Sequence, residues 1–121
     1  MSDSMEGIQA SIAIGILWTD DDRLIDAEAL LRSVHSAAAL LEDNQTQRAA
    51  ALALGRCLLW RGRIDEAGAV VAPLLSNAAP ACAWALAARI RLASGAAERA
   101  GHAASRALEC AATSRSCRDA A

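Results

Sequence analysis

A recurrence of apolar, alanine and glycine positions is the most informative pattern along this chain. Leu54-Gly55, Gly62 and Glu66-Ala67 are followed, at one constant offset, by Ala87-Ala88, Gly95 and Arg99-Ala100. The same offset superposes three further pairs: Leu59 on Leu92, Gly68 on Gly101 and Leu75 on Leu108. A period of roughly 34 residues with this punctuation is typical of arrays of helical hairpins. The pattern therefore predicts pairs of helices, each joined by a tight glycine turn.

The central hairpin is expected at about residues 46–76, with a first helix at 46–61 and a second at 64–75. Gly62 suits the position just past a helix end, where a positive φ is needed. Asp65 and Glu66 place negative charge at the positive N-terminus of the second helix. Pro73 removes a backbone donor, so we expect a kink or an early stop near residues 69–71.

The last hairpin is expected at about residues 80–112, with Pro80 at its first helical position and its turn at Gly95. Its second helix would run from Ala96 to about Ala112. The polar tail 113–121 is expected to be frayed.

A weaker copy lies upstream, at a somewhat larger offset. It superposes Gly15 on Gly55, Leu24 on Ile64, Asp26-Ala27 on Glu66-Ala67 and Leu31 on Val71. Its turn, Thr19–Asp22, is interpreted as a helix-capping cluster, and a metal-binding loop is the less favoured interpretation. The second helix would run from Arg23 to Leu41, which gives a hairpin at about residues 5–41.

Composition supports a helical fold. The chain is 55% hydrophobic but only 2% aromatic, and alanine, the best helix former, is abundant. Trp18, Trp60 and Trp84 fall on the first helices of the hairpins, where we expect them to pack in the core. The expected fold is all-α, with about six helices in antiparallel helix-turn-helix hairpins that form a single domain over residues 1–121.

These residues resemble the tetratricopeptide family. The pattern is carried in one repeat by Trp84, Ala87-Ala88, Gly95 and Ala100, and in the other by Leu54-Gly55, Gly62, Ala67 and Val71. The resemblance implies hairpins stacked as a short α-solenoid, in which the first helix of each pair lines a groove. On that basis Arg56, Arg89 and Arg91 are candidate contacts for an acidic protein partner, and ordinary solvated arginines are the alternative.

The segment 53–67 also resembles repeats of bacterial transcriptional regulators of the LuxR/MalT and sigma-54-activator types. In those regulators such repeats are sensory or protein-binding segments beside ATPase and DNA-binding domains. This chain has no Walker A motif, so those activities do not carry over.

Motifs of catalysis are also missing from the sequence. It contains no GxSxG, HExxH or GxGxxG motif, and its four cysteines lack the spacing of a zinc or redox site. His35 has no serine or cysteine partner at a motif spacing, and His102 lies in an alanine-rich helix. We therefore expect no enzyme activity, no cofactor and no bound metal.

Charge is divided unevenly along the chain. Residues 1–47 carry a net charge of −7 and residues 48–121 a net charge of +5, for a total of −2. That balance makes nucleic acid an improbable partner, although a regulator that contacts nucleic acid through the basic half is retained as the alternative. The acidic N-terminus and the short apolar run 12–18 predict a cytoplasmic protein without a membrane span.

The sequence thus favours a protein–protein interaction module, such as an adaptor in bacterial signalling or transcription. A fragment of a larger regulator is a further alternative. The alanine-rich helix expected at 96–112 lacks a strongly charged stripe, so a homodimer that covers this face is a second expectation.

Overall fold

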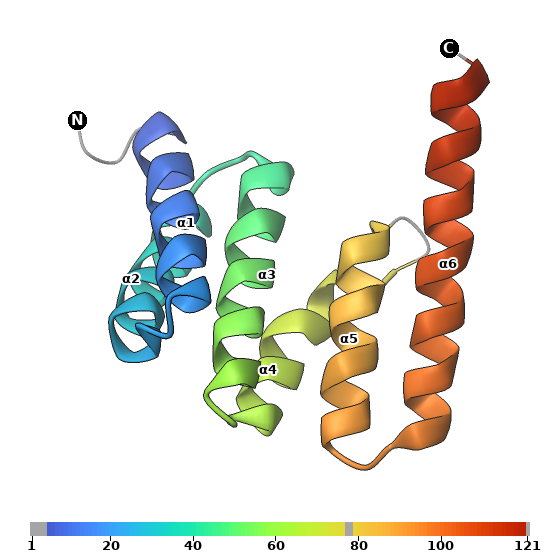
Figure 1. The fold of residues 1–121 in the computed structure, drawn as a ribbon. Coiled ribbons are helices and arrows are strands. Elements are labelled where there is room, and N and C mark those ends of the chain that lie inside the picture. Colours follow the sequence, from blue (N-terminus) through green and yellow to red (C-terminus); the bar gives the residue numbers. More distant parts are fainter. Residues whose placement is uncertain (1–4, 77–78, 121) are drawn as a thin grey trace. The chain divides into compact units, whose positions relative to one another are not determined.

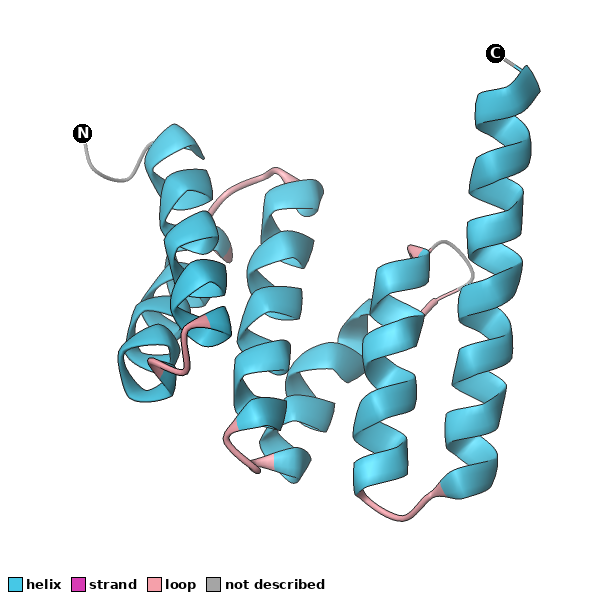
Figure 2. Ribbon diagram, in the orientation of Figure 1, coloured by secondary structure: helices cyan, strands magenta, loops and turns pink. Residues whose placement is uncertain are grey.

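The computed structural model describes residues 5–76 and 79–120, with side chains described as far as residue 113. Within these residues the chain forms six α-helices and one short 3-10 helix, and it contains no strand (Figure 2). The elements are α1 (Met5–Asp20), α2 (Leu24–Ala38), α3 (Asn44–Trp60), α4 (Ile64–Val71), η1 (Ala72–Leu74), α5 (Ala81–Ala93) and α6 (Ala97–Ala120). The expectation of an all-α fold is confirmed.

The helices gather into two compact units, divided between Val70 and Val71. In the first unit α1 packs on α2, α2 packs on α3, and α1 also contacts α3. In the second unit α5 packs along α6, and the two run antiparallel (Figure 1). The helices therefore pack as sequential neighbours, as hairpins require, while the single-domain assignment for residues 1–121 stays a prediction.

The three hairpin turns share one backbone geometry. The turn residues Asp22, Gly62 and Gly95 all have positive φ, at 62°, 80° and 85°. In each turn this residue donates its N–H to the carbonyl three positions back, and the next residue donates to the carbonyl five positions back, at distances of 2.8–3.2 Å. This is the Schellman arrangement, which satisfies the last carbonyls of a helix. The turns expected at Gly62 and Gly95 are confirmed.

The helices that follow the three turns also share a buried alanine at the same position. Ala27, Ala67 and Ala100 lie five positions beyond the three turn residues, and each is at most 6% exposed. Each donates its backbone N–H to the carbonyl four positions earlier, at 2.9–3.0 Å. A buried alanine in the first turn leaves space for a neighbouring helix to approach closely. Both offsets found in the sequence thus correspond to a repeated local structure.

The first turn corrects one expectation. Thr19–Asp22 does not cap α2, because the N-cap residue is Arg23 and no side chain makes a capping hydrogen bond there. The Thr19 hydroxyl instead donates to the carbonyl of Gly15 at 2.8 Å. Asp22 takes the position that glycine occupies in the other two turns, since aspartate tolerates positive φ better than most residues.

Several helix boundaries also differ from expectation. Helix α2 ends at Ala38, short of Leu41, and α3 begins at Asn44 because Asp43 caps it by accepting a hydrogen bond from the N–H of Gln45. Pro80 was expected to be the first helical residue of α5, but it is the N-cap, and the helix begins at Ala81. Helix α6 continues past Ala112 to Ala120, so most of the tail expected to fray is helical. Residues 113–120 include neither proline nor glycine, the residues that most readily stop a helix.

Helix α4 is the shortest of the six α-helices in the described residues. It ends at Val71, and the chain continues as η1 through Pro73. Proline cannot donate the backbone hydrogen bond that would extend the helix. The early stop expected near residues 69–71 is confirmed.

The core of the first unit is made of aliphatic side chains and alanine. Leu31, Cys57 and Leu58 are fully buried, and the Cys57 thiol donates weakly to the carbonyl of Leu24, at 3.7 Å. No helix in the described part of the chain is both long and apolar enough to cross a bilayer.

The three tryptophans differ in burial, although all were expected in the core. Trp84 of the second unit is buried, which confirms its assignment. Trp18 is half-buried. Trp60 is 59% exposed, so its assignment to the core is wrong. It is the last residue of α3, where the chain turns away from the packed helices.

Candidate functional site

The three candidate partner-binding arginines lie in different units, Arg56 in the first and Arg89 and Arg91 in the second. Arg56 forms an ion pair with Asp20. Arg89 is exposed on α5. Arg91 donates to the backbone carbonyl of Arg99 at 3.1 Å, and burial, with the nearby charge of Arg99, lowers its pKa. Two of the three are therefore already engaged within the chain.

Trp84 lies among three cationic or aromatic side chains of α5 and α6. The guanidinium carbon of Arg91 lies 6.0 Å from the centre of the Trp84 ring, and that of Arg106 lies 5.3 Å away. His102 approaches the same indole edge-on, with ring centres 6.2 Å apart. These contacts have the geometry of cation–π and edge-to-face packing, which stabilises the α5–α6 pair.

A network of charged side chains joins α2, α3 and α4 in the first unit. Glu28 is only 8% exposed and accepts hydrogen bonds of 2.9 Å from both Arg32 and Arg61. Glu66 accepts hydrogen bonds from Arg32 at 2.6 Å and from Arg63 at 3.2 Å. Burial alone would raise the pKa of Glu28, but the hydrogen bonds from its arginine partners outweigh it, so the pKa lies below 4.5. The network neutralises the basic groups at the end of α3.

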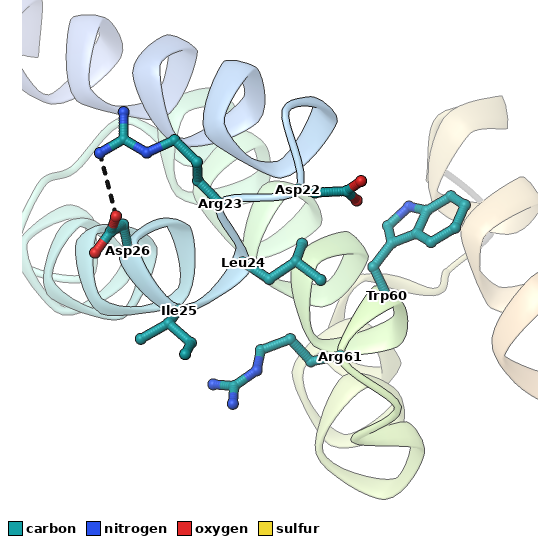
Figure 3. Close-up of a pocket in the computed structure, with 7 residues that line it drawn as sticks. All are labelled: Asp22, Arg23, Leu24, Ile25, Asp26, Trp60 and Arg61. Carbon is teal, nitrogen blue, oxygen red and sulfur yellow. Dashed lines mark hydrogen bonds and ion pairs between the residues drawn. The ribbon is translucent and has the colours of Figure 1, made fainter.

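A hollow opens beside this network, at the α1–α2 turn and the end of α3 (Figure 3). Its volume is about 640 Å³. It is lined by Asp22, Arg23, Leu24, Ile25, Asp26, Trp60 and Arg61. All seven belong to the first unit, so the hollow is complete within it.

Apolar side chains form part of the hollow. Trp60 is 59% exposed and Ile25 is 71% exposed, while Leu24 is half-buried. In Figure 3 the indole of Trp60 stands free of the ribbon, on the same side as the side chains of Asp22 and Leu24. Exposed apolar groups that line a concave surface, together with a few polar groups, are the usual composition of a binding site.

The charges of the hollow are mostly paired. Arg23 bonds Asp26 at 3.1 Å, and Arg61 is held by Glu28. Asp22 makes no ion pair with any residue whose side chain the structure describes. The left-handed backbone of Asp22 fixes the direction in which its side chain leaves the chain. The hollow therefore combines an exposed indole with an uncompensated negative charge.

Helix α1 adds a second exposed apolar surface. Ile8, Ile12 and Gly15 are buried, yet Ile14 and Leu17 on the other side of the helix are 42% and 63% exposed. A helix that is apolar on both faces normally has both faces covered. This outer face is therefore suited to contact with another protein.

Sequence reasoning missed the hollow because it assigned Trp60 to the core and Asp22 to a cap. The repeat offsets contained the correcting signal. They superpose Trp60 on Ala93 and on Asp20, which are not core positions of a repeated hairpin. A large aromatic residue without a buried equivalent in the other repeats indicates a feature specific to its own hairpin.

Comparison of the chain with protein-family models, with curated proteins and with solved structures finds no match. The arrangement of its residues therefore carries the functional argument. Among the described residues no group of three or more histidine, cysteine or carboxylate side chains is placed to hold a metal ion.

Proposed function

We propose that this chain is a non-enzymatic protein–protein interaction module, built from helical hairpins of tetratricopeptide type. The observation that carries the proposal is the exposure of Trp60 and Ile25 in one hollow. Burying a large apolar side chain contributes about 1.5–3 kcal/mol, so leaving two of them in water forgoes a substantial stabilisation that a partner can supply. The outer face of α1, with Ile14 and Leu17, offers further apolar area for the same purpose.

The tetratricopeptide assignment rests on the three equivalent turns and on the buried alanine that follows each of them. Repeats of this kind bind other proteins through surfaces that their stacking creates. An adaptor role in a regulatory assembly follows from the same reasoning. Of the arginines first considered for partner contact, Arg89 retains the most freedom, because Arg56 and Arg91 are held by Asp20 and by Trp84 with Arg99.

Site-specific photo-crosslinking tests the proposal. A benzophenone amino acid is placed at Trp60, or at Leu17, in the protein expressed in its native host. Ser36, which is exposed on α2 and polar, provides the matched control position. We expect discrete adducts of defined mass from positions 60 and 17 and none from position 36. Absence of adducts at both apolar positions, or equal adducts at all three, would contradict the proposal.

A further inference from the structure

We propose that the hollow at the α1–α2 turn binds a basic side chain, of arginine or lysine, from a segment of a partner protein. The cation lies against the Trp60 indole and is neutralised by the Asp22 carboxylate. This inference rests on the proposed function and specifies which chemistry of the partner the first unit recognises.

The indole provides the first part of such a site. The face of a tryptophan ring carries negative electrostatic potential and attracts a cation within about 6 Å of its centre, more strongly than tyrosine or phenylalanine does. Trp60 is 59% exposed, so a face or edge of its ring is open to solvent. The chain itself already uses this chemistry, because the guanidinium carbon of Arg23 lies 4.5 Å from the centre of the Trp18 ring.

The apolar lining provides the second part. Arginine and lysine have long aliphatic stems that pack on apolar surface while the charged end stays near water. Ile25 and Leu24 line the hollow together with Trp60. In Figure 3 the Leu24 side chain points toward the indole, so a basic side chain can pack its stem on Leu24 and reach Trp60 at the same time.

The carboxylate of Asp22 provides the third part. The backbone N–H of Asp22 donates to the carbonyl of Thr19 at 3.2 Å, and the backbone N–H of Arg23 donates to the carbonyl of Trp18 at 2.8 Å. The turn therefore holds the aspartate backbone in one conformation. Figure 3 shows the carboxylate directed toward the indole. A counter-ion on an ordered backbone loses less entropy when the cation arrives than one on a mobile loop.

Other occupants fit the hollow less well. An acidic side chain would meet Asp22, while the two arginines of the hollow are already paired with Asp26 and Glu28. A purely apolar side chain would remove water from the Asp22 carboxylate without replacing its hydrogen bonds, which is costly for a charged group. A cation with an aliphatic stem satisfies both the apolar and the acidic parts of the lining.

Nuclear magnetic resonance of the tryptophan indoles provides the test. The probes are three short peptides of glycine and serine with one central residue: arginine, lysine, or citrulline, which has nearly the shape of arginine without its charge. We expect the arginine and lysine peptides to shift the Trp60 indole N–H signal while leaving that of buried Trp84 in place. The citrulline peptide is expected to have little effect. Equal shifts with citrulline, or none with any peptide at millimolar concentration, would overturn the proposal.

A pair of charge variants locates the counter-ion. Asp22→Asn removes the charge but keeps a residue that tolerates positive φ, so the turn is preserved. We expect it to weaken binding of the arginine peptide by about two- to fivefold, the range for an exposed ion pair. Asp21→Asn removes the same charge one residue earlier and serves as the matched control, with a smaller effect expected. Equal effects of the two substitutions would show that Asp22 has no specific role and would overturn the proposal.

The two proposals can fail separately. Crosslinking from position 60 in the absence of peptide binding would leave the interaction module standing and would overturn the basic occupant. Peptide binding that depends on Asp22, without crosslinks from positions 60 and 17, would support the recognition chemistry and would contradict the proposed role in the cell.

Discussion

The backbone of Gly15 on α1 lies directly against the side chain of Leu31 on α2. A Cβ atom at position 15 would come within 2.5 Å of Leu31 Cδ2 and 2.6 Å of Leu31 Cγ. Leu31 is fully buried and packed on its other sides, so it cannot move away freely. The close approach of the first two helices therefore depends on the absence of a side chain at this position.

Gly15→Ala is expected to destabilise the protein. Alanine would gain about 1 kcal/mol from helix propensity. The clash with Leu31 costs about 1–3 kcal/mol, as overpacking of a core typically does, and outweighs that gain in most of this range. Urea denaturation followed by far-ultraviolet circular dichroism measures the net change in the free energy of unfolding.

Gly101→Ala is the matched control, because Gly101 is also helical but a Cβ there would meet nothing within 4 Å. This variant is expected to be stabilised by about 0.5–1 kcal/mol, since only the propensity gain remains. The packing explanation fails if both substitutions change stability in the same direction.

Asp22 and the two turn glycines give a second prediction. Asp22→Gly and Asp22→Asn should leave stability within about 0.5 kcal/mol, because both residues accept positive φ. Asp22→Ala should destabilise by about 1 kcal/mol, the typical cost of the left-handed conformation for a residue with an ordinary Cβ. Gly62→Ala and Gly95→Ala should behave like Asp22→Ala, since nothing lies within 4 Å of either added Cβ and the effect is conformational alone. Thermal and urea denaturation of the five variants provide the comparison.

The Glu28 network makes stability depend on pH. The folded-state pKa of Glu28 lies below its usual 4.5, so the network stabilises the fold fully above that pH and loses its contribution as pH falls through the lowered pKa. Glu28→Gln is expected to cost about 1–2 kcal/mol at neutral pH, because charge-assisted hydrogen bonds to Arg32 and Arg61 are weakened. It should also flatten the loss of stability at acid pH.

Glu42 supplies the control for this prediction, because it is exposed and forms no ion pair with the described side chains. Denaturation of the wild type, Glu28→Gln and Glu42→Gln is measured from neutral pH to below pH 4.5. If the stability of Glu28→Gln falls as steeply with decreasing pH as that of the wild type, the Glu28 network does not control the acid sensitivity of the fold.

Much of the fold could be predicted from the sequence, because the repeat is marked by residues with strong local preferences. Gly62 and Gly95 end their helices in the left-handed conformation, and Pro73 stops α4, as local chemistry requires. The position of the turn at Asp22 was predicted, but its left-handed backbone conformation was not. Aspartate serves both as a cap and as a left-handed residue, so the sequence alone does not distinguish the two roles.

The hollow could not be predicted in the same way. Its lining combines the turn after α1 with the end of α3, so it depends on how the helices of the first unit pack. The partner assignments for Arg56 and Arg91 rested on their place in the first helix of a hairpin, whereas the ion pair with Asp20 and the contact with Trp84 form only in the folded chain. Side chains that can reach several partners are fixed by tertiary structure, not by local sequence.

Thiol reactivity distinguishes the two units' cysteines and gives the last prediction. Cys57 is fully buried, and this burial raises the pKa of its thiol, so both access and the thiolate fraction are low. Cys82 is exposed near the start of α5. In native buffer iodoacetamide should therefore modify Cys82 readily and Cys57 at a rate limited by unfolding, as followed by mass spectrometry of tryptic peptides. In denaturant Cys57 should also react readily, because unfolding removes its burial. Equal rates of the two cysteines in native buffer would contradict the burial of Cys57 in the first unit.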